Sequence, residues 1–453
     1  MKDEKFKKNL FGGLILAVFV IAVVNIFNAI SSKELSTFEI VFLAMETYIF
    51  VFSTYYLVLT FFGWKKYEKR YPDAEPETKF AVIVPGHNEE KVISGIVKNL
   101  NNDMNYPRDM FEVFVIADNC TDSTASIARS HGANVFENTT PKGSPKGKPY
   151  AIKAFLENNP DIYEKFDVLT IFDADNIVHF DYFREVNSQF IANKDCDLIQ
   201  CRVLSKNPDD NYISGGYSLS ESFMNRFYTI PKQRFGLNTT IQGTGFNVRL
   251  DYLKEVGWNP KSITEDFEFQ VEMSNLNKKS QFNCDAKIYD EKPTTTKNSL
   301  VQRLRWSRGH WNVAFSNTFK ILGSIVKHRT LTSLDTFFYS YNMSRTLLMG
   351  IGLILSVLSI FNIIDLPLSI YNNIFVSLFT IFYTLALVYT AYQEQVDDKG
   401  SMNFVHCVVS YLWFTVTYIP LHLLSLLTFK SQTWKRTEKG INVSLEDRLK
   451  NSK

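Results

Sequence analysis

The 453-residue chain has little cysteine and almost no net charge. Its five cysteines are odd in number and scattered, and no pair has the spacing of metal ligands. This usage favours a reducing, cytosolic compartment over a disulfide scaffold. The formal net charge of +2 provides no overall field for nucleic acid, so nucleic acid is not expected as a partner.

Other patterns are missing as well. The chain has no internal repeats, no low-complexity tract and no obvious module for binding a cyclic dinucleotide. Regulation by such a nucleotide would therefore need a partner subunit. No Gly-X-Gly-X-X-Gly pattern follows the first expected strand, which argues against a soluble dinucleotide-binding enzyme.

Apolar residues, by contrast, are abundant at both ends of the chain. Residues 9–32 and 38–62 are each long enough to cross a bilayer at about 1.5 Å per residue. A signal peptide is the alternative for the first run, but the run is too long and lacks a clean cleavage site. Basic residues from Lys65 to Arg70 follow the second run, which places that side in the cytoplasm. We expect a transmembrane hairpin over residues 1–70.

The C-terminal region, residues 331–453, is apolar again. An interfacial amphipathic helix is expected over residues 331–345. Three spans at about 346–364, 374–392 and 404–429 would follow, and a basic tail would end the chain. Three spans would leave the C-terminus outside, whereas the basic tail favours the cytoplasm. The sequence leaves this parity open.

Between these regions, residues 71–330 alternate strand and helix signals. The alternation predicts an α/β fold, a mostly parallel sheet with helices on both faces. Such sheets bind ligands beyond the carboxyl ends of their strands. The expected strands are 80–84, 111–117, 134–136 and 168–172, and the expected helices are 91–100, 123–132 and 150–157.

Polar residues stand where these strands end. Asp173 and Asp175 follow the last strand, and two hard oxygen ligands at that spacing suit Mg²⁺ or Mn²⁺ bridging a diphosphate. A polar turn is the alternative for an isolated Asp-X-Asp. Glu89 lies at a helix start after the first strand, and Asp118 ends the second, placed to accept hydrogen bonds from a base or ribose. Lys148 lies in a loop, broken by proline and glycine, that can hold diphosphate oxygens.

Three further motifs lie later in the chain. The glycines in Gln242–Asn247 let a ligand or another segment approach the backbone. The adjacent acids of Thr264–Glu268 can include a general base, although a helix first turn explains them as well. Residues 302–311 hold three arginines and two tryptophans, which can bind a diphosphate and stack on sugar rings. An aromatic and basic belt at a membrane interface is the alternative for that last motif.

The order of these motifs resembles that of membrane-integrated family 2 glycosyltransferases. These include the cellulose, chitin, hyaluronan and poly-N-acetylglucosamine synthases. The motifs are Asp118, Asp173-Ala-Asp175, Thr264-Glu-Asp266 and Gln302-Arg-Leu-Arg305-Trp306. The resemblance covers residues 80–311 by motif and the flanking spans by layout. It implies a GT-A catalytic domain that uses a UDP-sugar and Mg²⁺ or Mn²⁺.

The resemblance also implies how the donor is held. Asp118 would contact the uridine, with Glu89 and Lys148 completing the nucleotide-sugar site. Asp173 and Asp175 would hold the metal and the diphosphate, and Asp175 is the expected direct ligand.

Catalysis and acceptor binding follow from the same resemblance. Asp266, with Glu265 beside it, would act as general base, and Arg305, helped by Arg308, would neutralise the departing diphosphate. The expected acceptor-binding residues are Gly243, Thr244, Gly245, Gln302 and Trp306. The tail at 433–437 loosely resembles a gate over the donor pocket, and a basic membrane anchor is the alternative.

The expected function is an inverting transfer of glucose or N-acetylglucosamine to a growing β-linked polysaccharide, coupled to export. The enzyme would be a multi-pass membrane protein with a cytoplasmic catalytic domain and, as partners, a glycan acceptor, the bilayer and an accessory export or regulatory subunit. One alternative is the addition of a single sugar to a lipid. The other is a non-catalytic transporter or scaffold with a nucleotide-binding domain.

Overall fold

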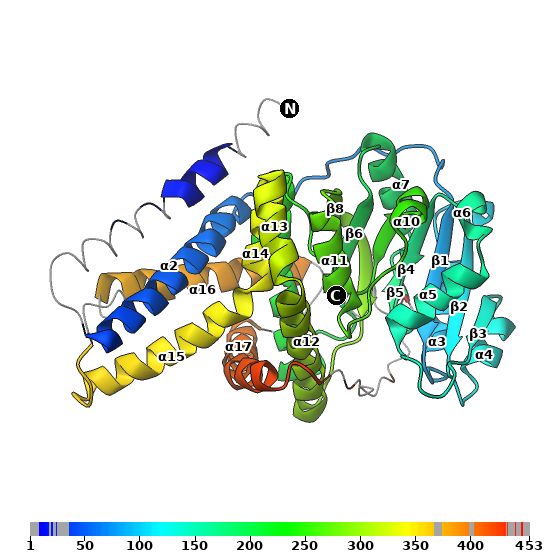
Figure 1. Cartoon of the computed structure of the whole chain (residues 1–453). Coiled ribbons are helices and arrows are strands. Elements are labelled where there is room, and N and C mark those ends of the chain that lie inside the picture. Colours follow the sequence, from blue (N-terminus) through cyan, green and yellow to red (C-terminus); the bar gives the residue numbers. More distant parts are fainter. Residues whose placement is uncertain are drawn as a thin grey trace.

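A mixed eight-stranded sheet forms the centre of the computed structural model, in the order β3-β2-β1-β4-β7-β6-β8-β5 (Figure 1). The structure describes residues 9–17, 20, 24, 36–366, 374–397, 403–431, 433, 440, 445 and 446. The strands are β1 (Phe80–Gly86), β2 (Phe111–Asp118), β3 (Asn134–Asn138), β4 (Val168–Ile171), β5 (Ile177–Val178), β6 (Leu198–Ser205), β7 (Phe246–Arg249) and β8 (Ser280–Asp290).

The first four strands confirm the sequence-based expectation. β1 pairs in parallel with β2 and with β4, so that Phe80 lies opposite both Phe111 and Val168. β3 extends this parallel half beyond β2. The rest of the sheet is mixed, because β7 runs antiparallel to both β4 and β6, while β6 and β8 are parallel.

Helices cover both faces of the sheet, as predicted. Because side chains alternate along a strand, Phe80, Val82 and Val84 join one hydrophobic cluster, while Ala81 and Ile83 join another. The first cluster includes residues of α3, α4 and α7, and the second includes residues of α5, α6, α10 and α11. These helices are α3 (Ile93–Asn102), α4 (Thr124–Ser130), α5 (Lys148–Asn158), α6 (Ile162–Lys165), α7 (Tyr182–Ala192), α10 (Leu250–Val256) and α11 (Glu265–Asn275).

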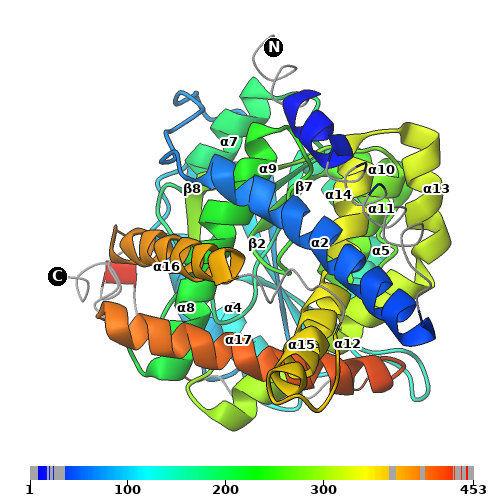
Figure 2. The same ribbon diagram turned by 90° about the vertical axis from the view of Figure 1, so that its left-hand side faces the viewer.

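The remaining helices lie on the side of β6, β8 and the chain ends. Figure 2 shows α2, α15, α16 and α17 gathered in front of the sheet and its covering helices. These helices are α2 (Thr37–Gly63), α8 (Tyr212–Met224), the π-helical turn η2 (Asn225–Thr229), α9 (Ile230–Arg234), α12 (Thr296–Ser316), α13 (Thr318–His328), α14 (Leu331–Ser340), α15 (Asn342–Ile360), α16 (Ile374–Asp397) and α17 (Phe404–Leu427). A short 3₁₀ turn, η1 (Arg108–Met110), precedes β2.

Three helices in the described residues are long and apolar enough to cross a membrane: α2, α15 and α17. They match three of the expected spans, and α16 forms at the place of a fourth. Of the first expected span, residues 9–17 are helical and most of the remainder lies outside the described residues, as does most of the tail at 433–437. Phe11 stacks on Phe235 and lies edge-on to Tyr55, so the start of the first run lies beside the later part of α2.

The expected helix over residues 331–345 is wrong in extent, because the chain forms α14, breaks at Tyr341 and continues as α15. Asp335, one of the polar residues behind that expectation, is buried. It forms an ion pair of 2.7 Å with Lys232 and accepts a hydrogen bond from the Tyr55 hydroxyl. The buried ion pair therefore joins α14 to α9, and the hydrogen bond joins α14 to α2.

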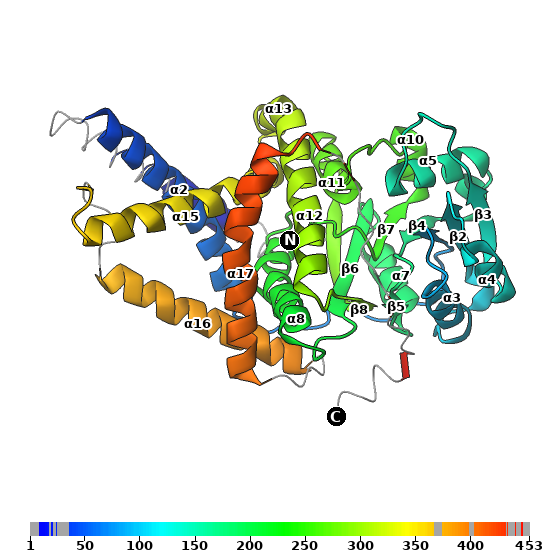
Figure 3. The same ribbon diagram turned by 90° about the horizontal axis from the view of Figure 1, so that it is seen from below.

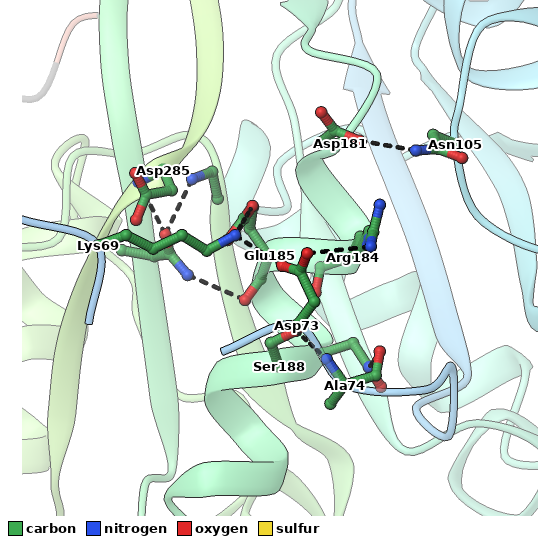
Figure 4. A network of polar contacts seen from close by, with 12 residues as sticks. Lys69, Asp73, Ala74, Asn105, Asp181, Arg184, Glu185, Ser188 and Asp285 are labelled. Carbon is green, nitrogen blue, oxygen red and sulfur yellow. Dashed lines mark hydrogen bonds and ion pairs between the residues drawn. The ribbon is translucent and has the colours of Figure 1, made fainter. Parts of the chain in front are cut away.

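The linker between α2 and β1 is held on α7 (Figure 4). At its exposed edge, Lys69 Nζ lies 2.6 Å from Asp73 and 2.7 Å from Glu185, and Arg184 lies 3.0 Å from Asp73. Beneath these ion pairs, the fully buried Asn187 Oδ1 accepts hydrogen bonds from the backbone N–H groups of residues 77 and 78.

Replacing Asn187 should therefore destabilise the fold much more than breaking the surface ion pairs. In Asn187→Ala the backbone N–H groups of residues 77 and 78, the second of them buried, lose their acceptor, at a cost of about 2 kcal/mol in unfolding free energy. The matched control, Asp73→Ala, removes two half-exposed ion pairs and should cost less than about 1 kcal/mol. Thermal unfolding of the purified proteins measures both, and equal losses would contradict this account of the linker.

Candidate active site

One lysine joins three motifs that are far apart in the sequence. Lys148, at the start of α5, places its Nζ 2.7 Å from Asp173 Oδ1, 2.6 Å from the carbonyl oxygen of Gly243 and 3.4 Å from Glu265 Oε1. Burial by itself would lower the pKa of Lys148, but the carboxylates of Asp173 and Glu265 outweigh it and raise the pKa above its ordinary value. The ammonium group therefore stays charged between the two carboxylates.

The turn after β4 is held by hydrogen bonds to its backbone and side chains. The N–H of Asp173 donates to Thr244 Oγ1 at 3.0 Å and to Asn176 Oδ1 at 3.2 Å. Asn176 Nδ2 in turn donates to Asp290 Oδ1 at the end of β8. Asp173 is partly exposed, whereas Asp175 is only 2% exposed. The two carboxylates thus differ in access to solvent although one residue separates them.

The glycine loop before β7 needs its glycines for both space and backbone geometry. Gly243 and Gly245 have φ values of +75° and +63°, which favour glycine. A Cβ on Gly243 would lie 3.2 Å from Asp266 Oδ2, and one on Gly245 would overlap the side chains of Cys201 and Ile288. The loop backbone therefore comes close to the Asp266 carboxylate.

Asp266 lies in the first turn of α11, directly after Glu265. Burial, and then the neighbouring charge of Glu265, raise the pKa of Asp266 to about 7, although Lys148 and Arg305 act in the opposite direction. A carboxylate with such a pKa can take up and release a proton near neutral pH, which is what a general base requires.

α12 carries the arginine and tryptophan motif to this place. A Cβ on Gly309 would lie only 2.5 Å from Thr264 Oγ1, so α12 crosses the start of α11 where it has no side chain. This close crossing brings Arg305 near enough to Asp266 to influence its pKa. Trp306 packs edge-on against Tyr217, at 6.1 Å between ring centroids, and is 36% exposed.

The other polar residues of α12 turn elsewhere. Arg308 Nε donates to Thr428 Oγ1 at 2.8 Å, and Arg303 is buried against α17. Gln302 is buried as well. Among the three arginines of the motif, Arg305 is the one whose charge acts on Asp266.

Asp118 is the last residue of β2, and Glu89 lies three residues after the end of β1. Asp118 accepts hydrogen bonds of 2.7 Å from the side chains of both Asn119 and Asn138. Burial raises the pKa of Asp118, while those two amides and the charge of nearby Lys146 lower it in part. Glu89 follows Gly86, and its side chain lies next to the backbone of that residue.

Sequence reasoning missed some residues that shape the site. Asn176 directly follows the paired aspartates of the Asp-Ala-Asp-Asn stretch, and that position was the available signal. Gly309 lies three residues after Trp306, and a glycine inside a helix marks a close approach. Asn138, which supports Asp118 from β3, carried no signal at all, because only the sheet brings it there.

Residues 76–309, more than half of the chain, match the family described as "Glycosyltransferase like family 2". The chain belongs to glycosyltransferase family 2. It is therefore a glycosyltransferase, as the order of its motifs predicted, and its sheet has the GT-A-like fold.

Individual relatives are distant. The chain is 24% identical over 407 residues to "Probable glycosyltransferase YdaM" of Bacillus subtilis, covering 83% of this chain and 89% of that one. It is 26% identical over 250 residues to "Beta-monoglucosyldiacylglycerol synthase" of a Nostoc species, covering 52% of this chain and 51% of that protein. It thus spans only about half the length of that relative.

A solved structure supports the fold. The mannosyltransferase PcManGT of Pyrobaculum calidifontis, solved in complex with GDP-Man and Mn²⁺, superposes with a TM-score of 0.52 at 16% identity. The superposition covers 83% of this chain and 99% of that one.

A side chain at residue 309 should disturb catalysis without unfolding the protein. In Gly309→Ala the new methyl group pushes α12 away from Thr264, and a displacement of about 1 Å at Arg305 should lower kcat about 100-fold. Gly323→Ala on α13 is the matched control, because nothing lies within 4 Å of its Cβ position. It should keep full activity. Sugar transfer by both variants, with thermal unfolding alongside, tests this, and an active Gly309→Ala would refute the close crossing.

Proposed function

We propose that this family 2 glycosyltransferase transfers glucose or N-acetylglucosamine from a UDP-sugar to a growing β-linked polysaccharide at a membrane. The observation that carries the proposal is the meeting of Lys148 with Asp173, Gly243 and Glu265, beside Asp266. A donor site, a general base and an acceptor loop are the parts that sugar transfer needs.

The donor would lie along the carboxyl ends of β1, β2 and β4. Asp118 and Glu89 would contact the nucleoside, and Lys148 would face the diphosphate. One further negative charge develops on the diphosphate as its bond to the sugar breaks, so Lys148 and Arg305 are most valuable if they act there. Arg308 could join them only by giving up its hydrogen bond to Thr428.

Asp173 and Asp175 would hold Mg²⁺ or Mn²⁺. The Lys148 ammonium group already lies 2.7 Å from Asp173 Oδ1, so the space facing this carboxylate accepts a cation. In the described part of the chain no three His, Cys, Asp or Glu side chains gather as metal ligands, so diphosphate and water would complete the coordination. A bound metal would supply positive charge to the leaving diphosphate. PcManGT was solved in complex with Mn²⁺, which supports a divalent metal here.

Asp266 would be the general base. Its carboxylate would take the proton from the acceptor hydroxyl while that oxygen attacks the anomeric carbon and the bond to the diphosphate breaks. The attack comes from the face opposite the leaving group, so an α-linked donor gives a β-linked product. Glu265 is bound to Lys148, and this contact supports assigning the base to Asp266 rather than to Glu265.

The acceptor would lie between the loop Gly243–Gly245 and α12. The partly exposed Trp306 would stack on the terminal sugar, and Gln302 would position α12. The resemblance to "Glucomannan 4-beta-mannosyltransferase 1" of Oryza sativa favours a polymer product. The resemblance to the Nostoc glycolipid synthase favours a second candidate, the addition of one sugar to a lipid.

Membrane-spanning helices would precede and follow the catalytic domain, which comprises about residues 71–330. α2 and α15 are candidate spans on either side of it. We place the catalytic domain on the cytoplasmic side, where nucleotide sugars are made. Coupling of synthesis to export and an accessory subunit are further parts of this proposal.

The size of the product decides between the two candidates. Membranes containing the enzyme are incubated with radiolabelled UDP-sugars and Mg²⁺ or Mn²⁺, and we expect a long polymer from UDP-glucose or UDP-N-acetylglucosamine. Asp266→Asn should lose about 10²–10⁴-fold in rate, because the base is removed. Glu272→Gln, on the same helix, should stay active. A single labelled sugar on a lipid would favour the second candidate, and an active Asp266→Asn would refute the assigned base.

The rate should also depend on pH in a defined direction. Because the pKa of Asp266 is raised to about 7, the base is protonated and inactive below that pH, and kcat/KM should rise through pH 7 to a plateau. Glu265→Gln removes the neighbouring charge that raises this pKa, so the inflection should move to lower pH. The measurement is the pH profile of kcat/KM for both proteins. An unmoved inflection would show that another group controls it.

A further inference from the structure

α17 is long and apolar enough to span a membrane, but its contacts indicate another position. We infer that α17 lies flat along the membrane surface, with one apolar stripe in lipid and both ends on the side of the catalytic domain. This inference does not depend on the donor or the acceptor.

Both ends of α17 contact elements of the catalytic domain. Near its beginning, Cys407 packs with Leu219 of α8. At its other end, Thr428 accepts the hydrogen bond from Arg308 of α12, and Phe429 lies edge-on to Phe315 at 5.1 Å. A helix of this length extends about 36 Å. If it crossed a bilayer, its two ends would lie on opposite sides.

The middle of α17 is bound to α12 as well. Arg303 donates to the carbonyl oxygen of Phe414 and to Thr417 Oγ1, both at 2.9 Å. Further along, Ser307 Oγ lies 3.3 Å from His422 Nδ1. A spanning α17 would therefore draw α12 and its three arginines into hydrocarbon, which is strongly unfavourable.

The exposed face of α17 is a continuous apolar stripe, defined here by six residues that are 49–74% exposed. They recur at intervals of three, four or seven residues, which places them on one side of a helix. The opposite side is buried on α8 and α12. The stripe consists of Val405, Val409, Leu412, Val416, Leu423 and Leu427.

Lipid fits this stripe because α17 meets the candidate span α15. Figure 3 shows α17 lying across α15 and α16, next to the catalytic domain. A Cβ on Gly350 of α15 would lie 2.9 Å from Ile419, so the two helices cross closely. α15 exposes apolar residues of its own, among them Leu353 and Ile354. The stripe is thus continuous with the apolar surface of a candidate span.

This position of α17 resolves a question that the sequence left open, namely on which side of the membrane the C-terminus lies. With α17 outside the count of spans, α15 leads away from the catalytic domain and α16 leads back to it. Described residues of the tail agree, because the N–H of Gly440 donates to Glu291 Oε1 at 3.0 Å. Leu445 is buried with Ile177, Leu204 and Tyr289 of the sheet. Gly440 and Leu445 therefore lie on the catalytic side.

Depth measurements along the stripe test the inference. In a Cys120→Ser background, where the other native cysteines are buried, single cysteines at Val405, Leu412, Val416 and Leu427 are spin-labelled in liposomes. Accessibility to oxygen against a water-soluble nickel chelate gives the depth of each label. We expect four similar, shallow depths. In a spanning helix, labels 22 residues apart would differ by roughly 30 Å along the membrane normal.

Leu353 and Ile360 on α15 provide the matched control, since labels there should differ in depth by about 10 Å. Retained sugar transfer shows that each labelled protein is folded. A graded series of depths in α17, deepest in the middle, would overturn the inference. So would four labels fully exposed to water, because the stripe would then not contact lipid.

Discussion

The charge of Lys148 holds the candidate active site together. Its ammonium group touches a carboxylate from the turn after β4, a carboxylate from the start of α11 and a carbonyl of the glycine loop. Without a cation at this point, Asp173, Glu265 and Asp266 would place like charges together in a largely buried place, at a high electrostatic cost. Because the lysine offsets the charge of these acids, a site that contains several carboxylates can still accept an anionic donor.

Much of the fold could be predicted from the sequence. The first four strands, at residues 80–172, are short apolar runs bounded by turns, and each forms within a few residues of its expected place. The antiparallel insertion of β7 between β4 and β6 could not be predicted, because Phe246–Arg249 is too short to carry a pattern. The candidate site, too, could be predicted only in part. The motif order identified its acids and arginines, whereas supporting residues such as Asn138 depend on pairing between distant strands.

The terminal helices are attached to the catalytic domain by buried charges rather than by apolar packing alone. Glu394 of α16 accepts from Arg202 on β6 and from Arg226 on η2, at 3.2 Å and 3.1 Å, and Arg226 also donates to the carbonyl oxygen of Trp64. With the Lys232–Asp335 pair, these contacts fix α2, α14 and α16 in register with the sheet. Buried ion pairs contribute little net stability, but they penalise every arrangement that separates them. Orientation, more than stability, is what they provide.

α12 packs against two other helices. The backbone of its Gly309 lies against the start of α11, and the guanidinium of its Arg303 binds α17. α12 therefore connects the apolar stripe of α17 with Arg305, whose charge acts on Asp266. If the stripe rests in lipid, lateral pressure and acyl-chain order act directly on the geometry of sugar transfer. Turnover would then follow the phase behaviour of the surrounding bilayer, with a break in its temperature dependence where the lipids freeze, even though no lipid touches a reacting atom.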